Sequence, residues 1–191
     1  MPEVVGTFSH VIGFDDAPFA RDHRGDVVVV GAAFAGRRLE GVLMTRVRRD
    51  GTDATRSLQQ AVRSSRFAAH ASLVLLQGIA FAGFNVVDIH ALHAALGLPV
   101  LVVARRRPDL ARIKKALLEA VPGGKRKWRL IEKAGAMEPA AGVWIQRAGL
   151  GLAAAERVVV RLAVNGRIPE PLRTAHLIAT ALGGGHSRQR V

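Results

Sequence analysis

The sequence predicts a mixed α/β fold, with a sheet of three antiparallel strands followed by parallel strands and with helices on both faces. Two observations favour this fold class, and a third shows that the chain folds. Three strand-like segments at the start of the chain are separated by short turns, and strands joined by short hairpins pair antiparallel. Two later runs of Leu and Val are separated by a helical segment, and such crossovers join parallel strands. Hydrophobic residues make up 49% of the chain, which excludes a mainly disordered protein.

The first elements are three strands and a helix. Strands are expected at residues 7–16, 27–34 and 39–48. A short turn at Gly36-Arg37-Arg38 joins the second to the third, whose residues alternate between two faces of a sheet. Asp50-Gly51 ends the third strand. Apolar and small residues then recur at helical spacing from Leu58 to Ala69, with Thr52 or Asp53 placed as the helix N-cap.

The remaining elements alternate between strands and helices. Strands are expected at 73–76, 100–103 and 143–147, and helices near 86–96, 108–121, 152–164 and 171–182. The helix that opens at Pro108 stops at Pro122-Gly123-Gly124 and a basic linker follows. Because the later strands follow crossover helices, we expect them to be parallel. Three antiparallel strands, then helix–strand–helix–strand–helix, is the order of a ribonuclease H-like fold. We expect one domain over residues 1–182 and a disordered basic tail over residues 183–191.

The charge of the chain indicates a polyanionic partner. Lys and Arg number 28 against 15 Asp and Glu, giving a net charge of +13 and a pI near 11.7. Such a field attracts nucleic acid or an anionic membrane surface, and clustered cations favour nucleic acid. The candidate nucleic-acid-binding residues are Arg105, Arg106, Arg107, Lys114 and Lys115. The alternative is a solvated face with scattered counterions.

Composition also bounds the setting of the protein. The chain has no cysteine, which excludes disulfides and thiolate metal sites and is compatible with a reducing cytosol. No apolar stretch is long enough to span a membrane, and the start of the chain has no basic segment followed by a long apolar core. We therefore expect a cytoplasmic protein with no membrane partner. Aromatic residues are only 5% and Tyr is absent, which argues against a base-stacking platform for single strands.

Asp15 and Asp16 end the first apolar run and form a rare acidic pair in this basic chain. Two carboxylates about 4 Å apart repel by roughly 4 kcal/mol at an effective dielectric near 20. A divalent metal ion or a nearby arginine would compensate. A metal site of this kind favours phosphodiester chemistry, with Mg²⁺ or Mn²⁺ held against substrate phosphates. The alternative is an Asx turn, in which Asp15 or Asp16 bonds local backbone just before Pro18.

Several motifs resemble a known family. The middle of the chain is similar to endonuclease V, in which a strand ends in Asp-Gly, a glycine-containing loop follows and the next strand ends in Val-Ala-Lys. The C-terminal block resembles that family's Arg-Leu-Pro-Glu-Pro-x-Arg-x-Ala-His ending. More closely, nearly all of residues 5–182 resemble the uncharacterised, largely archaeal family "domain of unknown function ninety-nine", which is related to endonuclease V. The motifs that carry these resemblances are Leu76-Gln77-Gly78, Val102-Val103-Ala104-Arg105, Arg167-Ile168-Pro169-Glu170-Pro171, Gly13-Phe14-Asp15-Asp16 and Ala82-Gly83-Phe84-Asn85-Val86-Val87-Asp88.

The resemblance implies roles for individual residues. Asp15 matches a metal-ligating aspartate of the first strand, and Arg105 matches a lysine that contacts the scissile phosphate. Asp53 lies where a second acidic ligand would fall, with helix N-cap as its alternative role. His176 matches a histidine near the metals, and its alternative role is to pack under the sheet from a helix face.

Gln77 departs from the nuclease pattern, which has a metal-ligating Asp immediately before Gly78. A neutral amide offers one carbonyl oxygen but removes a unit of negative charge, and Mg²⁺ usually requires carboxylate charge. The implied metal site is therefore weakened. The Pro-Tyr-x-Pro segment that wedges into DNA in endonuclease V has no counterpart, so hypoxanthine specificity is not expected.

Asp16, Asn85 and Asp88 lie in the matched motifs and are further candidate site residues. The alternative role of Asp88 is to complement a helix dipole. His90 and His93 have helical spacing, but without a third ligand they give only a weak metal signal.

The sequence therefore predicts a nucleic-acid-binding protein of the endonuclease V-like type. If active, it would be a metal-dependent endonuclease acting on DNA or RNA. The competing class is a catalytically inactive nucleic-acid-binding or scaffold protein that kept the fold and lost the ligand at Gln77.

Overall fold

A computed structural model describes residues 8–184 of the chain. Its main element is a seven-stranded sheet with the order β3-β2-β1-β4-β7-β9-β8. The strands of this sheet are β1 (His10–Asp16), β2 (Asp26–Ala35), β3 (Arg38–Arg48), β4 (Leu73–Gln77), β7 (Val100–Ala104), β8 (Glu138–Ala140) and β9 (Val143–Ala148). Two short strands, β5 (Ala80–Phe81) and β6 (Asn85–Val86), form a separate hairpin after β4.

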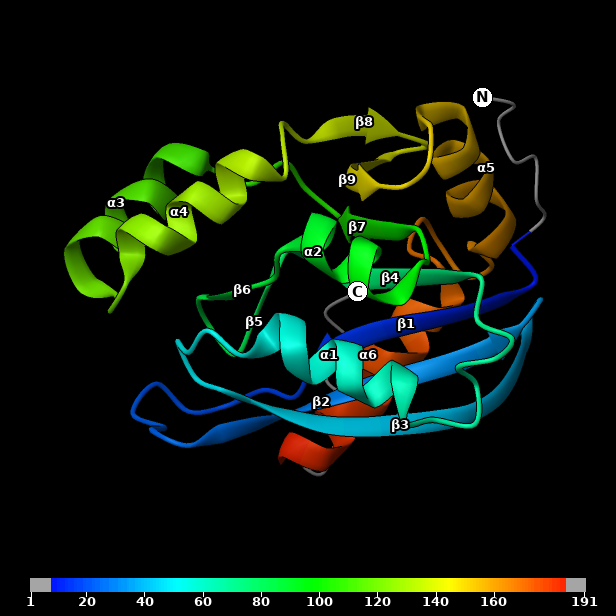
Figure 1. Ribbon diagram of the computed structural model, residues 1–191, viewed down its shortest axis with the longest axis horizontal. Coiled ribbons are helices and arrows are strands. Elements are labelled where there is room, and N and C mark those ends of the chain that lie inside the picture. The colour runs from blue at the N-terminus through cyan, green and yellow to red at the C-terminus, as the bar shows by residue number, and fades with distance from the viewer. Residues whose placement is uncertain (1–7, 185–191) are drawn as a thin grey trace.

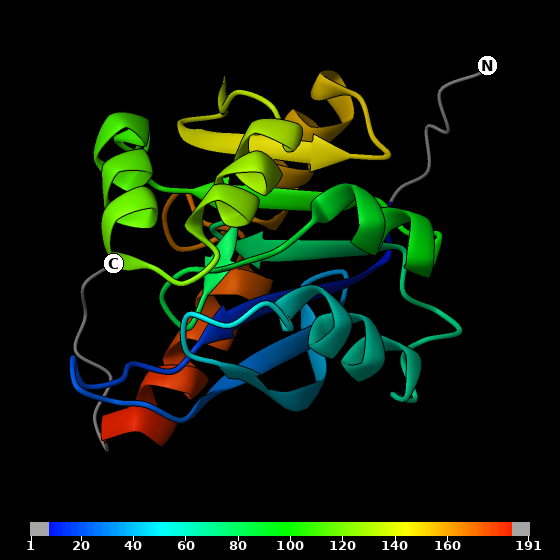
Figure 2. The same ribbon diagram turned by 60° about the vertical axis from the view of Figure 1, so that its left-hand side comes forward.

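Six helices accompany the sheet over the described part of the chain. They are α1 (Ala54–Arg63), α2 (Ile89–Leu96), α3 (Leu110–Ala120), α4 (Gly124–Lys133), α5 (Leu152–Leu162) and α6 (Glu170–Gly184). α1 and α2 cover one face, while α6, orange to red in Figure 1, crosses the opposite face. α3 and α4 form a helical hairpin that projects from the sheet (Figure 1 and Figure 2).

The predicted mixed sheet is confirmed for five strands. β1, β2 and β3 are antiparallel neighbours, and β1, β4 and β7 are parallel neighbours. α6 extends to Gly184, past the expected start of the tail at residue 183, and the rest of that expected tail lies outside the described residues.

The prediction that all later strands are parallel is wrong for β9, which is antiparallel to β7. The cause is a hairpin that the sequence analysis missed. Ala141 and Gly142, at φ angles of 49° and 82°, join β8 to β9, and two-residue turns with positive φ at both positions suit tight hairpins. β8 therefore runs parallel to β7, and β9 is inserted between them in the reverse direction.

The expected basic linker after Pro122 is also wrong, because this segment is the helix α4. The two glycines that indicated a stop instead allow a sharp reversal. Gly123 has a φ of 70°, and a Cβ on Gly124 would lie 1.8 Å from the carbonyl oxygen of Leu117. Glycine at both positions therefore lets α4 pack closely against α3.

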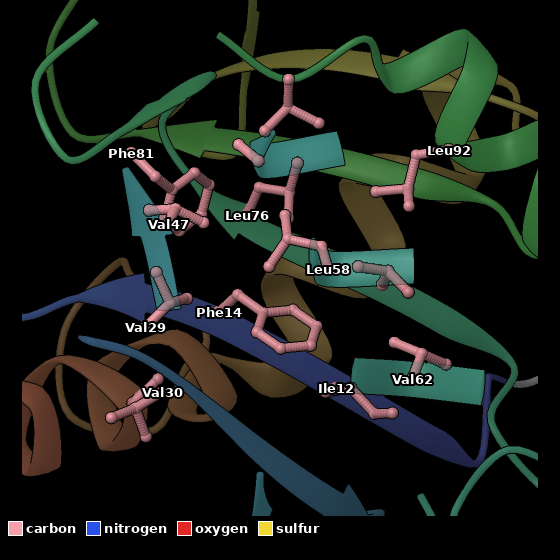
Figure 3. Packing of buried hydrophobic residues seen from close by; sticks show 14 of the residues in the cluster. Ile12, Phe14, Val29, Val30, Val47, Leu58, Val62, Leu76, Phe81 and Leu92 are labelled. Carbon is pink, nitrogen blue, oxygen red and sulfur yellow. The ribbon is translucent and has the colours of Figure 1, made fainter. Parts of the chain in front are cut away.

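The core is built by alternation along the strands. Ile12 and Phe14 of β1 point to the face covered by α1, where they pack with Leu58 and Leu76 (Figure 3). Val11 points to the opposite face, in a second cluster that includes residues of α5 and α6. The same alternation turns the side chain of Asp15 toward α6. No helix within residues 8–184 has the length and apolar character needed to cross a membrane.

Candidate active site

The carboxyl ends of several strands meet at one edge of the sheet, which we call the carboxyl edge. β1, β4 and β7 are parallel, and β3 runs in the same direction because two antiparallel pairings separate it from β1. Asp15 and Asp16 end β1, Gln77 ends β4, and Arg105 follows β7 directly. Ligand sites of open α/β sheets form at such an edge.

Asp15 and His176 form the centre of the candidate site. Asp15 is 5% exposed, and its Oδ1 accepts the backbone N–H of Asp16 at 2.9 Å. Its Oδ2 lies 2.7 Å from Nδ1 of His176 on α6. Gly13 permits this contact, since a Cβ there would lie 2.6 Å from the carbonyl carbon of Pro171. The absent side chain thus lets α6 approach β1.

The contact with Asp15 determines which ring nitrogen of His176 donates a hydrogen bond. An ionised carboxylate only accepts hydrogen bonds, so Nδ1 of His176 carries the hydrogen and Nε2 takes no part in this bond. The hydrogen bond to Asp15 raises the pKa of His176 above 6.5, with burial opposing the shift. The charge of Arg105 lowers the same pKa, which indicates that the guanidinium and the imidazole share one environment.

Asp16 is the second carboxyl group of the pair. Its Oδ2 accepts the backbone N–H of Ala82 at 2.7 Å. Burial, and then the neighbouring charge of Asp15, raise the pKa of Asp16 from 3.8 to about 6. The pair therefore resists holding two negative charges in weakly acidic solution.

Gln77 lies beside Asp15. Phe14 is in register with Leu76, so the next residues on β1 and β4 are neighbours on the same face of the sheet. The side-chain oxygen of Gln77 is buried and has no hydrogen-bond partner among the described residues. An unpaired buried acceptor costs about 1–3 kcal/mol. Such an oxygen is available to a ligand.

Two cavities open at the site. One of about 470 Å³ is lined by Asp15, Asp16 and His176, together with the loop after β1. A second, of about 230 Å³, is lined by Gln77, Arg105 and His176 among others. His176 borders both, so the carboxylates and the Gln77–Arg105 side open onto adjoining spaces.

Asp53, the expected second acidic ligand, is hydrogen-bonded to residues outside this group. Its Oδ1 accepts the backbone N–H of Arg48 at 3.2 Å and the Nδ2 of Asn85 at 2.6 Å. Asp53 precedes α1 but makes no capping hydrogen bond with its side chain. Asn85 caps the helix instead, since its Oδ1 accepts the backbone N–H of Ala54 at 3.0 Å. Asp53 and Asn85 therefore tie the start of α1 to the β3 and β6 segments.

Asp88 has the structural role that was its alternative. Its Oδ1 caps α2 by accepting the backbone N–H of Ala91 at 3.0 Å, and its Oδ2 pairs with Lys133 at 2.7 Å. Burial acts to raise the pKa of Asp88, but these hydrogen bonds outweigh it and the pKa is lowered. His90 and His93 each contact a backbone carbonyl, so their rings are engaged separately.

The candidate nucleic-acid-binding residues lie after β7 and on α3. All five are exposed: Arg105, Arg106, Arg107, Lys114 and Lys115. Arg107 lies over the ring of Trp144 at 5.4 Å, and Lys114 over that of Trp128 at 5.1 Å. Lys127, in the segment expected to be a basic linker, is only 1% exposed, which a charge pattern alone does not reveal.

The donor atoms fit a hard divalent cation in type but supply little charge. The Asp15 carboxylate and the unpaired Gln77 oxygen are the oxygen ligands that Mg²⁺ and Mn²⁺ accept. Within residues 8–184, however, no group of three or more Asp, Glu, His or Cys side chains is placed to hold a metal ion.

Comparisons with known proteins relate this chain to one protein family. The family model described as endonuclease dU matches residues 7–183. A UPF0215 protein of Deinococcus radiodurans is 61% identical over 192 residues, which cover 100% of this chain and 98% of that protein. A UPF0215 protein of Methanothermobacter thermautotrophicus is 43% identical over 182 residues, which cover 93% of this chain and 89% of that protein.

Solved structures confirm the predicted ribonuclease H-like fold. A protein of unknown function from Archaeoglobus fulgidus has a TM-score of 0.86 and 35% identity, over 92% of this chain and 99% of that one. Endonuclease V of Ciona intestinalis, solved with DNA containing an inosine, has a TM-score of 0.57 and 14% identity, over 87% of this chain and 82% of that one. That second likeness shows the fold alone. The match over residues 7–183 shows that the chain belongs to the endonuclease dU family.

Proposed function

We propose that this protein is a DNA endonuclease that hydrolyses a phosphodiester bond at or beside deoxyuridine. The single observation that carries the proposal is the Asp15–His176 pair, which lies next to the unpaired oxygen of Gln77 at the carboxyl edge. The name of the matching family supports the substrate, and the endonuclease V fold supports action on nucleic acid.

Asp15 and Gln77 are the residues that would hold a divalent cation. When bound, Mg²⁺ or Mn²⁺ would neutralise phosphate charge and favour ionisation of a water molecule. Asp15 also fixes the His176 tautomer, so Nε2 of the neutral ring can accept a proton at the site. Arg105 borders the same cavity as Gln77 and is placed to bind a phosphate oxygen of the substrate.

A second candidate function rests on the charge of the site. Gln77 is neutral, and among the described residues no three acidic or imidazole side chains converge as metal ligands. A protein that binds nucleic acid without cleaving it would need no such ligands. In that case the Asp15–His176 pair would serve to anchor α6 against β1.

Cleavage of defined substrates separates the two functions. The purified chain is incubated with otherwise identical duplexes that carry one deoxyuridine, thymidine or deoxyinosine, with Mg²⁺, Mn²⁺ or EDTA. We expect cleavage only of the deoxyuridine duplex and only when a divalent ion is present. Binding of all three duplexes without any cut would instead support the non-catalytic function.

A further inference from the structure

We propose that a cationic cavity between the start of α1 and α4 binds a phosphate of the nucleic-acid backbone. The proposal rests on the proposed function in one respect, because the phosphate belongs to the bound nucleic acid. It uses residues outside the candidate active site and outside the basic segment at Arg105–Arg107. The cavity has a volume of about 280 Å³.

Three cations border this cavity. Arg56 of α1 and Arg126 and Lys127 of α4 border it, with the side chains of Thr52 and Gln59 as neutral hydrogen-bonding groups. Arginine and lysine at hydrogen-bonding distance from one anion are the usual partners of a phosphate.

The acidic lining residue does not neutralise the cavity. Asp88 already pairs with Lys133, a cation outside the lining, at 2.7 Å. Its other carboxylate oxygen accepts the backbone N–H of Ala91. The three lining cations are therefore left in excess.

Lys127 is the observation that most directly points to an anion. Its side chain is 1% exposed, and its ammonium donates to the backbone carbonyl of Asp50, a neutral acceptor. Burial lowers the pKa of Lys127, and the nearby Asp50 carboxylate offsets this only in part. That carboxylate is itself engaged by the backbone N–H of Phe84 and by Arg49. A phosphate in the cavity would supply the missing negative charge.

The start of α1 adds a favourable field. The helix has no side-chain cap from Asp53 and no acidic residue in its first turn. Thr52 and Thr55, on either side of the helix start, both border the cavity. The N-terminal end of α1, which carries the positive end of the helix dipole, therefore borders the same space as the lining cations.

The cavity lies beside the same edge of the sheet as the candidate active site. β3 ends at the carboxyl edge, and the residues that follow it form one wall of the cavity. The backbone N–H of Asp50 donates to the carbonyl oxygen of Ala82, and the backbone N–H of Ala82 donates to the Asp16 carboxylate. These hydrogen bonds connect the segment after β3, which borders the cavity, to the candidate active site.

Alanine variants of the two exposed arginines test the proposal. The full chain is titrated against a deoxyuridine-containing duplex in EDTA, which prevents cleavage, at several salt concentrations. Arg56→Ala and Arg126→Ala should each weaken binding by about tenfold at low salt, as expected when one charge-assisted hydrogen bond to a phosphate is removed. The slope of log K against log salt should fall in magnitude by about 0.9 for each phosphate that the protein no longer neutralises. Arg37→Ala, in the exposed turn at the opposite edge of the sheet, is the matched control and should change neither.

A duplex with single methylphosphonates, which remove one backbone charge each, locates the phosphate that the cavity binds. One position should weaken wild-type binding while leaving Arg126→Ala unaffected. If wild type binds and cleaves but both variants behave like Arg37→Ala, the cavity proposal is overturned and the proposed function stands. If inorganic phosphate shifts the NMR signals of Arg126 while the variants bind DNA normally, the cavity takes a small anion instead. If wild type binds no DNA, the proposed function fails and the cavity proposal fails with it.

Discussion

Two partly buried polar clusters lie at the carboxyl edge, and they differ in how completely their hydrogen bonds are satisfied. In the Asp53–Asn85 cluster, Asn85 is 0% exposed and its amide makes three hydrogen bonds, to Ala54, Arg48 and Asp53. In the Asp15–His176 cluster, the adjacent Gln77 oxygen has no partner within residues 8–184. The pKa of Asp16 in that cluster is raised to about 6.

Both clusters contain residues of the matched sequence motifs, and this difference in hydrogen bonding distinguishes their roles. Polar groups whose hydrogen bonds are all made can hold a loop in place. Buried polar groups without a partner, or with a strongly shifted pKa, are typical of sites where a ligand binds. The first cluster therefore has a structural role, whereas the second is the one for which we propose a chemical role.

The largest expected effect is on cleavage. Asp15→Asn should reduce nicking of deoxyuridine DNA by on the order of 10³-fold, because it removes the buried charge that would hold a cation and orients His176. Gel assays under single-turnover conditions measure this loss. Asp22→Asn, at an exposed position, is the control and should retain full activity. A variant Asp15→Asn that cleaves like wild type would remove this cluster from the chemistry.

The next largest effect is on stability and concerns the Asp53–Asn85 cluster. Asn85→Ala should lower the free energy of unfolding by about 3 kcal/mol, because it removes three hydrogen bonds of a fully buried amide and leaves the buried N–H of Ala54 without its acceptor. Urea unfolding monitored by circular dichroism measures the change. Asn165→Ala, at an exposed position, should cost much less. An Asn85→Ala variant that is as stable as wild type but inactive would contradict a structural role for the Asp53–Asn85 cluster.

Asp16→Asn should stabilise the protein, but only above mildly acidic pH. The folded-state pKa of Asp16 is raised from 3.8 to about 6, so its ionised form is disfavoured in the folded protein. Wild type therefore loses stability as the pH rises through this window, by on the order of 2–3 kcal/mol in total. Asn keeps an acceptor for the Ala82 N–H and does not titrate. Unfolding in EDTA should show equal stabilities near pH 3.5 and a more stable variant at pH 8; a gap that is constant with pH would contradict the assignment.

The smallest effect tests whether Arg105 shares the site. Its positive charge lowers the pKa of His176, so Arg105→Ala should raise that pKa. NMR titration of the His176 ring protons measures the shift. Arg106→Ala, at the next exposed position, should leave the titration closer to wild type. An unchanged pKa in Arg105→Ala would separate the guanidinium from the imidazole.

Much of this arrangement follows from sequence pattern, and the failures have physical causes. The meeting of Asp15, Gln77 and His176 could be anticipated because each ends or follows an element with a matched motif. The β8–β9 turn could not, since Ala141 gives no sign that it adopts a positive φ. Long-range pairing decides the rest: the partnership of Asp53 with Asn85 and the burial of Lys127 depend on packing between segments far apart in the chain.

The central claim is that Asp15 and Gln77 belong to one cation site, and Mn²⁺ titration of Gln77→Asp tests it most directly. A second carboxylate beside Asp15 adds attraction for a dication. Calorimetry should therefore show at least about tenfold tighter Mn²⁺ binding in Gln77→Asp than in wild type, with increased nicking of DNA. Gln77→Asp combined with Asp15→Asn should lose both gains. Unchanged Mn²⁺ affinity and nicking in a folded Gln77→Asp protein would contradict the claim and favour the non-catalytic binding function.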